Sequence, residues 1–398
     1  MKKEKKNLLS LNKIDTYSFI EGFDLAISFS VVIYLCNFLF PNNDIRISII
    51  YVTTIAMLPY LIRIFVYLFF DKMKKIILIF KTNYFLLLIP MYLLILCIPQ
   101  QLQFISIAVL ILVKIFMGFL FTGFNPILIR NLNIQIGFKN DSVFKYFSFL
   151  LFGIIAGSLV FSITNEVLSN AELNKWGWKL PYLCILMFLL IFFLSSKKDK
   201  KLSLEDYNTF FSDVVKSKLN LRLQLQNLYI IIPLFFLILY CSSNWLTKFS
   251  NPENMLFLNI DTVFLILTFL SSLFIYPLLK IIGKSRATIF IVCFLLVISI
   301  IMSFFSIDSN YSVDFLKFYL SISSGLTLCI YLLDFETRSF RTRNQLFFAL
   351  NLPNLFIFLI IPLSFYYFIH FSISYNIIYI TFALIYLVCL LSRMNPKG

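Results

Sequence analysis

Long apolar blocks alternate with short polar intervals along the whole chain. Each block has about 20 residues, the length that a helix needs to cross a bilayer. The pattern predicts an all-α polytopic membrane protein of about 12 transmembrane helices. The expected spans lie at residues 17–39, 47–70, 77–98, 103–125, 143–164, 180–195, 227–246, 258–279, 287–306, 313–333, 345–368 and 373–392.

The stretch Ser195–Asn227 is the longest polar interval between two blocks, with about half of the blocks on either side. Within it, Ser203 and Asp206 have the spacing of a capping box, and apolar residues then recur at helical intervals. We expect a short amphipathic helix here, which either lies on the inner leaflet or binds a partner. The predicted organisation is an N-terminal six-helix bundle at 1–195, a cytoplasmic connector at 196–226 and a C-terminal six-helix bundle at 227–398.

The composition identifies lipid as the solvent of this chain. Hydrophobic residues make up 60% of it, charged residues only 13%, and the mean hydropathy is +0.90. A soluble domain has about 25% charged residues. The net charge of +15 is compatible with a nucleic-acid partner. Positive charge in cytoplasmic loops explains it better, so we expect no nucleic acid.

The positive charges also predict an orientation. Lys and Arg in the termini, the connector and every second loop number roughly 27, against roughly five in the alternate loops. Both termini and the connector are therefore expected in the cytoplasm. The first apolar block is too long for a signal peptide and lacks a small-residue cleavage site, so we expect it to be retained as a span.

Charges within the spans are the strongest candidates for function, because each is costly in hydrocarbon unless it is paired or wet. Glu21 and Asp24 lie three residues apart in the first span and share one helix face. Two carboxylates at close quarters favour a shared proton, as a proton-coupled carrier requires. The alternative is a structural ion pair or a helix end near the cytoplasmic surface.

Two cations within the spans could neutralise these acids or bind a carboxylate. Lys114 lies deep in the fourth span, so we expect it in the interior. Arg63 lies nearer the inner end of the second span, so we expect its side chain to snorkel to the surface.

Two short motifs stand out: Trp176–Pro181 reads Trp-Gly-Trp-Lys-Leu-Pro, and Glu21–Asp24 reads Glu-Gly-Phe-Asp. They resemble the Trp-Gly-Trp-Arg-Ile-Pro signature and the Glu-Trp-Tyr-Asp of the metabolite:proton symporters, a subgroup of the major facilitator superfamily that includes proline/betaine permeases. Lys114 stands where the family has Arg, close before the Gly118-Phe119 of the same span. Phe335–Arg338 resembles a Phe-Pro-Thr-Arg segment. The similar positions extend over most of the chain.

This resemblance implies a carrier that moves a small polar or zwitterionic solute with protons by alternating access. In this role Glu21 and Asp24 couple the proton or orient the solute, and Lys114 binds a carboxylate. Uncharged hydrogen bonds would come from Asn125 and Asn351. The expected inner gate consists of Asp71, Lys72, Lys75, Arg338 and Arg341.

The resemblance also implies the setting of the carrier. It predicts a monomer in a bacterial inner membrane, with solute, protons and lipid as partners. No cofactor and no metal site are expected.

Departures from the family pattern keep an alternative open. Tyr67 and Lys74 replace two glycines of the inner-loop motif, and Phe124 follows Gly123 where the family has an acid. These losses would suit a degenerate member that acts as a sensor or scaffold. A membrane enzyme is a third possibility, but the sequence has no cluster of catalytic polar residues, so we expect no enzymatic activity.

Overall fold

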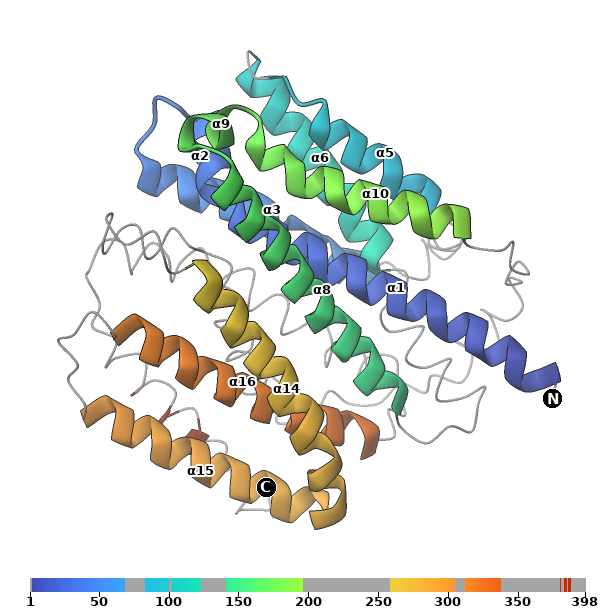
Figure 1. Cartoon of the computed structure of the whole chain (residues 1–398), viewed down its shortest axis with the longest axis vertical. Coiled ribbons are helices and arrows are strands. Elements are labelled where there is room, and N and C mark those ends of the chain that lie inside the picture. The colour runs from blue at the N-terminus through green and yellow to red at the C-terminus, as the bar shows by residue number, and fades with distance from the viewer. Residues whose placement is uncertain are drawn as a thin grey trace. The chain divides into compact units, whose positions relative to one another are not determined.

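The computed structural model describes residues 2–68, 83–99, 102–122, 141–195, 258–304 and 312–337, with a few residues between 380 and 387. All regular structure in these ranges is helical. The helices up to α10 belong to one compact unit, and α14, α15 and α16 belong to another, so each unit is described separately (Figure 1).

The helix bounds follow the hydropathy pattern. The nine predicted spans that fall largely within the described residues each correspond to a helix or to the bent pair α1–α2. Those at 227–246, 345–368 and 373–392 lie wholly or mostly outside these residues, as does the connector. The first unit contains α1 (Lys2–Ser30), α2 (Val32–Leu39), α3 (Ile45–Leu68), α5 (Tyr84–Leu96), α6 (Gln103–Thr122), α8 (Asp141–Val167), α9 (Asn170–Lys175), the 3-10 turn η1 (Gly177–Lys179) and α10 (Leu180–Ser195). The second contains α14 (Leu258–Ile282), α15 (Lys284–Phe304) and α16 (Ser312–Thr337).

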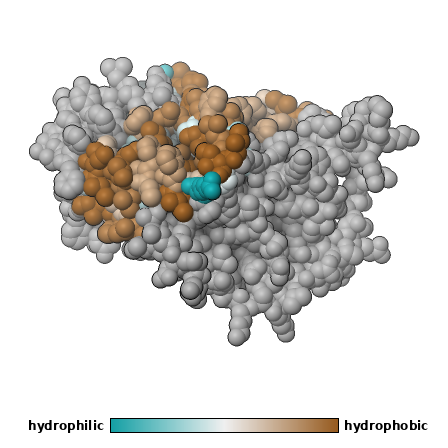
Figure 2. All heavy atoms as spheres, turned by 90° about the horizontal axis from the view of Figure 1, so that it is seen from below, coloured by the Kyte–Doolittle hydropathy of each residue, from teal (hydrophilic) through white to brown (hydrophobic). Residues whose placement is uncertain are grey.

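Apolar side chains cover the outside of these helices. In the described residues, 4 helices are long and apolar enough to cross a membrane, and the bent pair α1–α2 makes up to 5. Large exposed hydrophobic residues such as Phe104, Phe152 and Phe290 would be unfavourable in water but suit a lipid-facing surface. The described residues visible in Figure 2 are mostly hydrophobic, with only a small hydrophilic patch.

The first span is not straight. The segments Thr16–Ser30 and Val32–Leu39 meet at an angle of 57°. No Pro or Gly stands at the break, but Ser28 and Ser30 immediately precede it, and serine near a helix bend can compete for backbone hydrogen bonds. The bend lies about two helical turns beyond Asp24 and one beyond Ser28, so it redirects the chain close to the buried charges.

Glycines hold α1 directly against α8. A methyl group on Gly22 of α1 would overlap the backbone carbonyl oxygen of Leu150, and one on Gly153 of α8 would overlap that of Phe19. The two backbones can approach this closely only because no Cβ separates them. The low glycine content of the chain therefore coexists with close helix packing at this interface.

A second close pair is formed by α3 and α6. A Cβ on Gly118 would crowd Ile62 and the backbone of Pro59. Pro59 lies inside α3 and has no N–H to donate to the carbonyl of Ile55, which favours a local bend. Lys114 lies one turn before Gly118 on the same face of α6. The close approach of α6 to α3 therefore helps to bring Lys114 into the interior.

The second unit has a different interior. Every buried polar side chain described there is a Ser or Thr. Most of these hydroxyls donate to backbone carbonyls, as Thr268 does to Phe264 and Thr327 to Ser323, while Ser299 and Tyr319 share a short hydrogen bond. Gly325 of α16 lies against Ser271 of α14. Among the side chains whose burial the structure describes, the buried charges thus lie in the first unit.

Candidate functional site

Three polar side chains form one buried row on α1. Glu21, Asp24 and Ser28 are spaced by three and four residues, so they lie on the same helix face. All three are buried. An apolar helix that keeps two carboxylates in its interior must supply each of them with compensation from neighbouring helices.

Glu21 is compensated by α3. A nitrogen of the Arg63 guanidinium lies 2.6 Å from Glu21 Oε1. The guanidinium carbon also lies 4.8 Å from the ring centre of Tyr60 and 5.5 Å from that of Phe121. Because Arg63 is buried at 4% exposure, the expectation that it snorkels to the surface is wrong. The acid on the neighbouring helix holds it in the interior.

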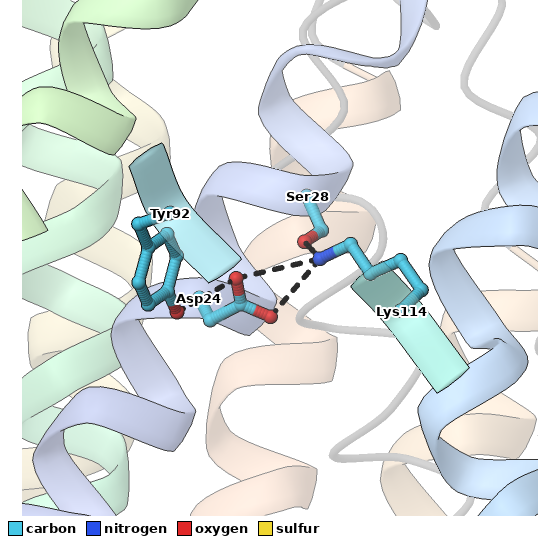
Figure 3. Close-up of polar contacts among 4 residues, drawn as sticks. All are labelled: Asp24, Ser28, Tyr92 and Lys114. Carbon is cyan, nitrogen blue, oxygen red and sulfur yellow. Dashed lines mark hydrogen bonds and ion pairs between the residues drawn. The ribbon is translucent and has the colours of Figure 1, made fainter. Parts of the chain in front are cut away.

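Asp24 is compensated by α6 and α5. The Nζ atom of Lys114 lies 3.1 Å from Asp24 Oδ2 and 3.3 Å from Oδ1, and it donates to Ser28 Oγ at 2.7 Å. The Tyr92 hydroxyl donates to Asp24 Oδ1 at 3.0 Å. Figure 3 shows these side chains pointing toward one another from three helices. The three N–H donors of a lysine are thus matched by three acceptor atoms.

The side chains of Glu21, Asp24, Arg63 and Lys114 carry no net charge together when all four are ionised. The desolvation of two such pairs is costly, and their mutual attraction offsets that cost only while both partners are present. Removing one partner would leave a buried charge without compensation, whereas exchanging it for another group of the same sign would not. This arrangement is therefore suited to charge exchange.

A small cavity opens beside the charges. Its wall is formed by α1, α3 and α6, and Pro59 of α3 is one of the lining residues. The cavity is narrow and admits about one water molecule. Ligand pockets are commonly larger, at about 300–1,000 Å³. The lining residues are Glu21, Asp24, Leu25, Ser28, Ala56, Pro59, Tyr60, Arg63 and Phe121.

The structure brings together three of the residues expected from the sequence. Glu21, Asp24 and Lys114 lie in one buried cluster, and the two acids face the cavity. The other expected site residues fall outside the part of the chain that the structure describes, so their roles stay predictions. These are Asn125, Asn351, Asp71, Lys72, Lys75, Arg338 and Arg341.

Two participants were not expected from the sequence. Ser28 has a weak signal, since it lies four residues after Asp24 and therefore on the same face. Tyr92 has no such signal, because it is one of 21 tyrosines and stands in a wholly apolar block. Among the described residues, no group of three or more His, Cys, Asp or Glu side chains could hold a metal ion.

Comparison with known proteins identifies the fold but not the family. No model of a protein family matches the chain, and no curated protein matches it. The E. coli xylose transporter XylE, in a partially occluded inward-open conformation, is similar at a TM-score of 0.63 and 12% identity, over 98% of this chain and 99% of that chain.

Two further solved structures agree with this result. The human organic anion transporter MFSD10 has a TM-score of 0.57 at 12% identity, over 96% of this chain and 99% of its own. XylE bound to 6-bromo-6-deoxy-D-glucose, described as a proton:xylose symporter, has a TM-score of 0.56 at 13% identity, over 98% and 95%. The chain therefore has the major facilitator fold, which confirms the predicted all-α polytopic fold class.

Proposed function

We propose that this protein is a secondary active transporter that carries a small polar or zwitterionic solute together with protons. The observation that carries the proposal is the Asp24–Lys114 pair, buried between apolar helices with Asp24 at the wall of a cavity. A buried ion pair is often no more stabilising than apolar residues of the same size. Its presence in a lipid-embedded helix bundle is therefore better accounted for by function than by stability.

The pair suggests how a proton and a solute would be coupled. When Asp24 binds a proton from one side of the membrane, Lys114 loses its counter-ion and can accept a carboxylate of the solute. When the carrier faces the other side, release of the solute returns Lys114 to Asp24, and the proton leaves. One proton then enters with each solute, and Lys114 has a carboxylate partner both before the proton binds and after the solute binds.

The scheme requires a carboxylate on the solute. Protonation of Asp24 leaves the cluster of two acids and two bases with one net positive charge, which the carboxylate of an organic acid would compensate in full, whereas a zwitterion would also bring a cation that needs a partner. Glu21 and Arg63 line the same cavity and could receive the second charge. Proline- or betaine-like compounds and organic acids remain the leading classes, because the sequence motifs resemble those of their transporters.

The remaining expected residues complete the proposal. Asn125 and Asn351 would supply uncharged hydrogen bonds to the solute. Salt bridges among the charged inner-loop residues would hold the cytoplasmic side closed in one state and break in the other. The proposed gate residues are Asp71, Lys72, Lys75, Arg338 and Arg341.

Uptake assays test the function directly. Cells that produce the protein would be given labelled proline, glycine betaine, a dicarboxylate, xylose and an organic anion, with and without a proton uncoupler. We expect uncoupler-sensitive uptake of at least one compound, and its loss in Asp24→Asn at unchanged membrane abundance. Asp44→Asn, which changes an exposed loop acid, is the matched control. Undiminished uptake by Asp24→Asn would remove Asp24 from the mechanism.

A degenerate carrier with a sensor or scaffold role is the second candidate. The narrowness of the cavity favours it, because little more than one water molecule fits there. This candidate predicts that a solute binds the purified protein without counterflow in proteoliposomes. Robust counterflow would eliminate it.

A further inference from the structure

The turn before α10 is joined to the end of α5 by Lys179. The Nζ atom of this lysine donates hydrogen bonds to the carbonyl oxygens of Leu96 at 2.9 Å and Ile98 at 2.8 Å. Carbonyls at the C-terminal end of a helix have no donor within the helix, and they carry the negative end of its dipole. A cation at this place therefore fixes the end of α5 to η1.

The same turn is packed by aromatic rings. Trp178 is fully buried, and its ring lies 5.1 Å from that of Phe38 and 6.3 Å from that of Tyr182, edge-on in both cases. Lys179 Nζ lies 5.4 Å from the centre of the Trp178 ring. Tyr182 in turn lies 6.3 Å from Tyr92. A line of ring contacts thus runs from the turn to Tyr92.

The end of this line is the Asp24 carboxylate. The Tyr92 hydroxyl donates to Asp24 Oδ1 at 3.0 Å. Tyr92 lies four residues before Leu96, which is about one helical turn. An anchor on the Leu96 carbonyl therefore sets the position of Tyr92 along the axis of α5, and a displacement of about 1 Å would break its hydrogen bond to Asp24.

We infer that Lys179 is a positioning residue for the carboxylate of Asp24. It fixes α5 at the axial position where the Tyr92 hydroxyl donates to Asp24. This inference rests on the proposed function, and it gives the Trp176–Pro181 segment a role. The segment would set the proton-binding behaviour of a carboxylate that it does not touch.

Other ionisable groups surround Asp24 as well, so the effect of Tyr92 must be separated from theirs. Lys114 faces Asp24 from α6, and α8 faces this part of α1 with glycines. Tyr60 on α3, Tyr84 on α5 and Tyr182 on α10 interact electrostatically with Asp24. Glu21 on α1 and Arg63 on α3 line the same cavity as Asp24. Variants of Lys179 leave all of these side chains unchanged.

The pH dependence of uptake provides one test. Tyr92→Phe removes a hydrogen bond to the ionised carboxylate, so we expect the midpoint of the pH profile to rise by about one pH unit. Lys179→Met should move the midpoint in the same direction, and the double variant should move it no further than the larger single change. Lys179→Arg keeps the charge and should restore the wild-type profile.

The control is Lys175→Met, which removes an exposed positive charge from the end of α9, four residues before Lys179. An unchanged midpoint in Lys179→Met, or a shift equal to that of Lys175→Met, would overturn the inference. Additive shifts of Lys179→Met and Tyr92→Phe would also overturn it, because the lysine would then act by another route.

A second measurement does not depend on transport. Thermal unfolding of the purified protein in detergent can be recorded for Lys179→Met, Tyr92→Phe and the double variant. We expect the double variant to lose less melting temperature than the sum of the single losses. Additive losses would refute the coupling even in a protein that transports nothing, whereas coupled losses without any uptake would refute only the proposed function.

Discussion

The two faces of α1 pack against their neighbours by opposite means. Toward α8 the contact is made by backbone and glycine, with Gly22 and Gly153 leaving no room for a side chain. Toward α3 and α6 the contact is made by ion pairs beside a cavity, through Glu21 and Asp24. The first face fits one arrangement only, because any added atom overlaps a carbonyl. On the second face, each carboxylate can change its partner, because another positive group can take the place of the cation that it now contacts.

This difference shows how one helix can serve both as a fixed support and as a switch. A carrier needs charged groups that change partners while the helix that bears them keeps its shape. In the proposed carrier, the glycine contact would supply the rigidity and the ion pairs would supply the exchange. The following substitutions disrupt one of these two contacts, except for the last, which lies away from both. They are ordered from the largest expected effect to the smallest.

Gly153→Val should abolish folding. Its side chain would overlap the carbonyl oxygen of Phe19, so α1 and α8 must separate, at a cost above the usual 1–3 kcal/mol of an overpacked core. The measurement is the yield of monodisperse protein in size-exclusion chromatography. Leu159→Val, on an exposed part of the same helix, should leave the yield unchanged. A normal yield of Gly153→Val would show that the contact is adaptable.

A double-mutant cycle tests the Asp24–Lys114 pair, and we expect the stability changes of the two substitutions to be non-additive. Asp24→Leu or Lys114→Met alone leaves one buried charge without compensation and should destabilise the protein by about 3–5 kcal/mol. The double variant removes both charges and should regain most of this stability, yet show no proton-coupled uptake. Thermal unfolding measures the cycle. A double variant as unstable as the sum of both changes would contradict the pairing.

Arg63→Lys should have a smaller effect. The lysine keeps the charge beside Glu21 but loses the planar contact with the rings of Tyr60 and Phe121. We expect a loss of about 1 kcal/mol in stability, with uptake retained. Arg63→Met, which leaves Glu21 without its cation, should be much less stable. Equal stability of the two variants would mean that the charge does not matter.

Ser169→Ala should have the smallest effect, because it lies away from both faces of α1. Ser169 and Glu172 form a capping box at α9, and the hydrogen bonds from Ser169 hold the pKa of Glu172 below its ordinary value. The stabilisation is therefore present above the ordinary pKa of a glutamate and is lost as the pH falls through the lowered value. The melting temperatures of variant and wild type should differ more near pH 7 than in acid, where only the loss of the hydrogen bond from the Glu172 N–H to Ser169 Oγ remains. A difference that does not shrink in acid would contradict this assignment.

The sequence predicted the helices well because hydropathy dictates them. The block at 143–164 became α8 at Asp141–Val167, and a charged pair inside apolar spans had few possible partners, so Lys114 was correctly expected in the interior. The bend after Ser30 could not be predicted in this way, because no Pro or Gly stands at the break. Arg63 was misjudged, because its depth alone suggested the surface and only the fold brings Glu21 within reach.

Tyr92 could not have been predicted. Its role depends on the axial position of α5 relative to α1. The contacts that set this position join residues more than 80 positions apart in the sequence, because Lys179 donates to the carbonyls of Leu96 and Ile98. Hydropathy carries no information on such offsets between helices. The glycines at Gly22 and Gly153 are likewise individually unremarkable in the sequence and become meaningful only when the helices cross.

The most direct test of the coupling role of Asp24 is the movement of protons during solute uptake into proteoliposomes. A pH-sensitive dye in the lumen would report protons, and labelled solute would be followed in parallel, for the wild type and for Asp24→Asn. We predict that the wild type acidifies the lumen as solute enters, whereas Asp24→Asn retains counterflow but neither accumulates solute nor moves protons. Acidification of the lumen by Asp24→Asn at the wild-type rate would contradict the account.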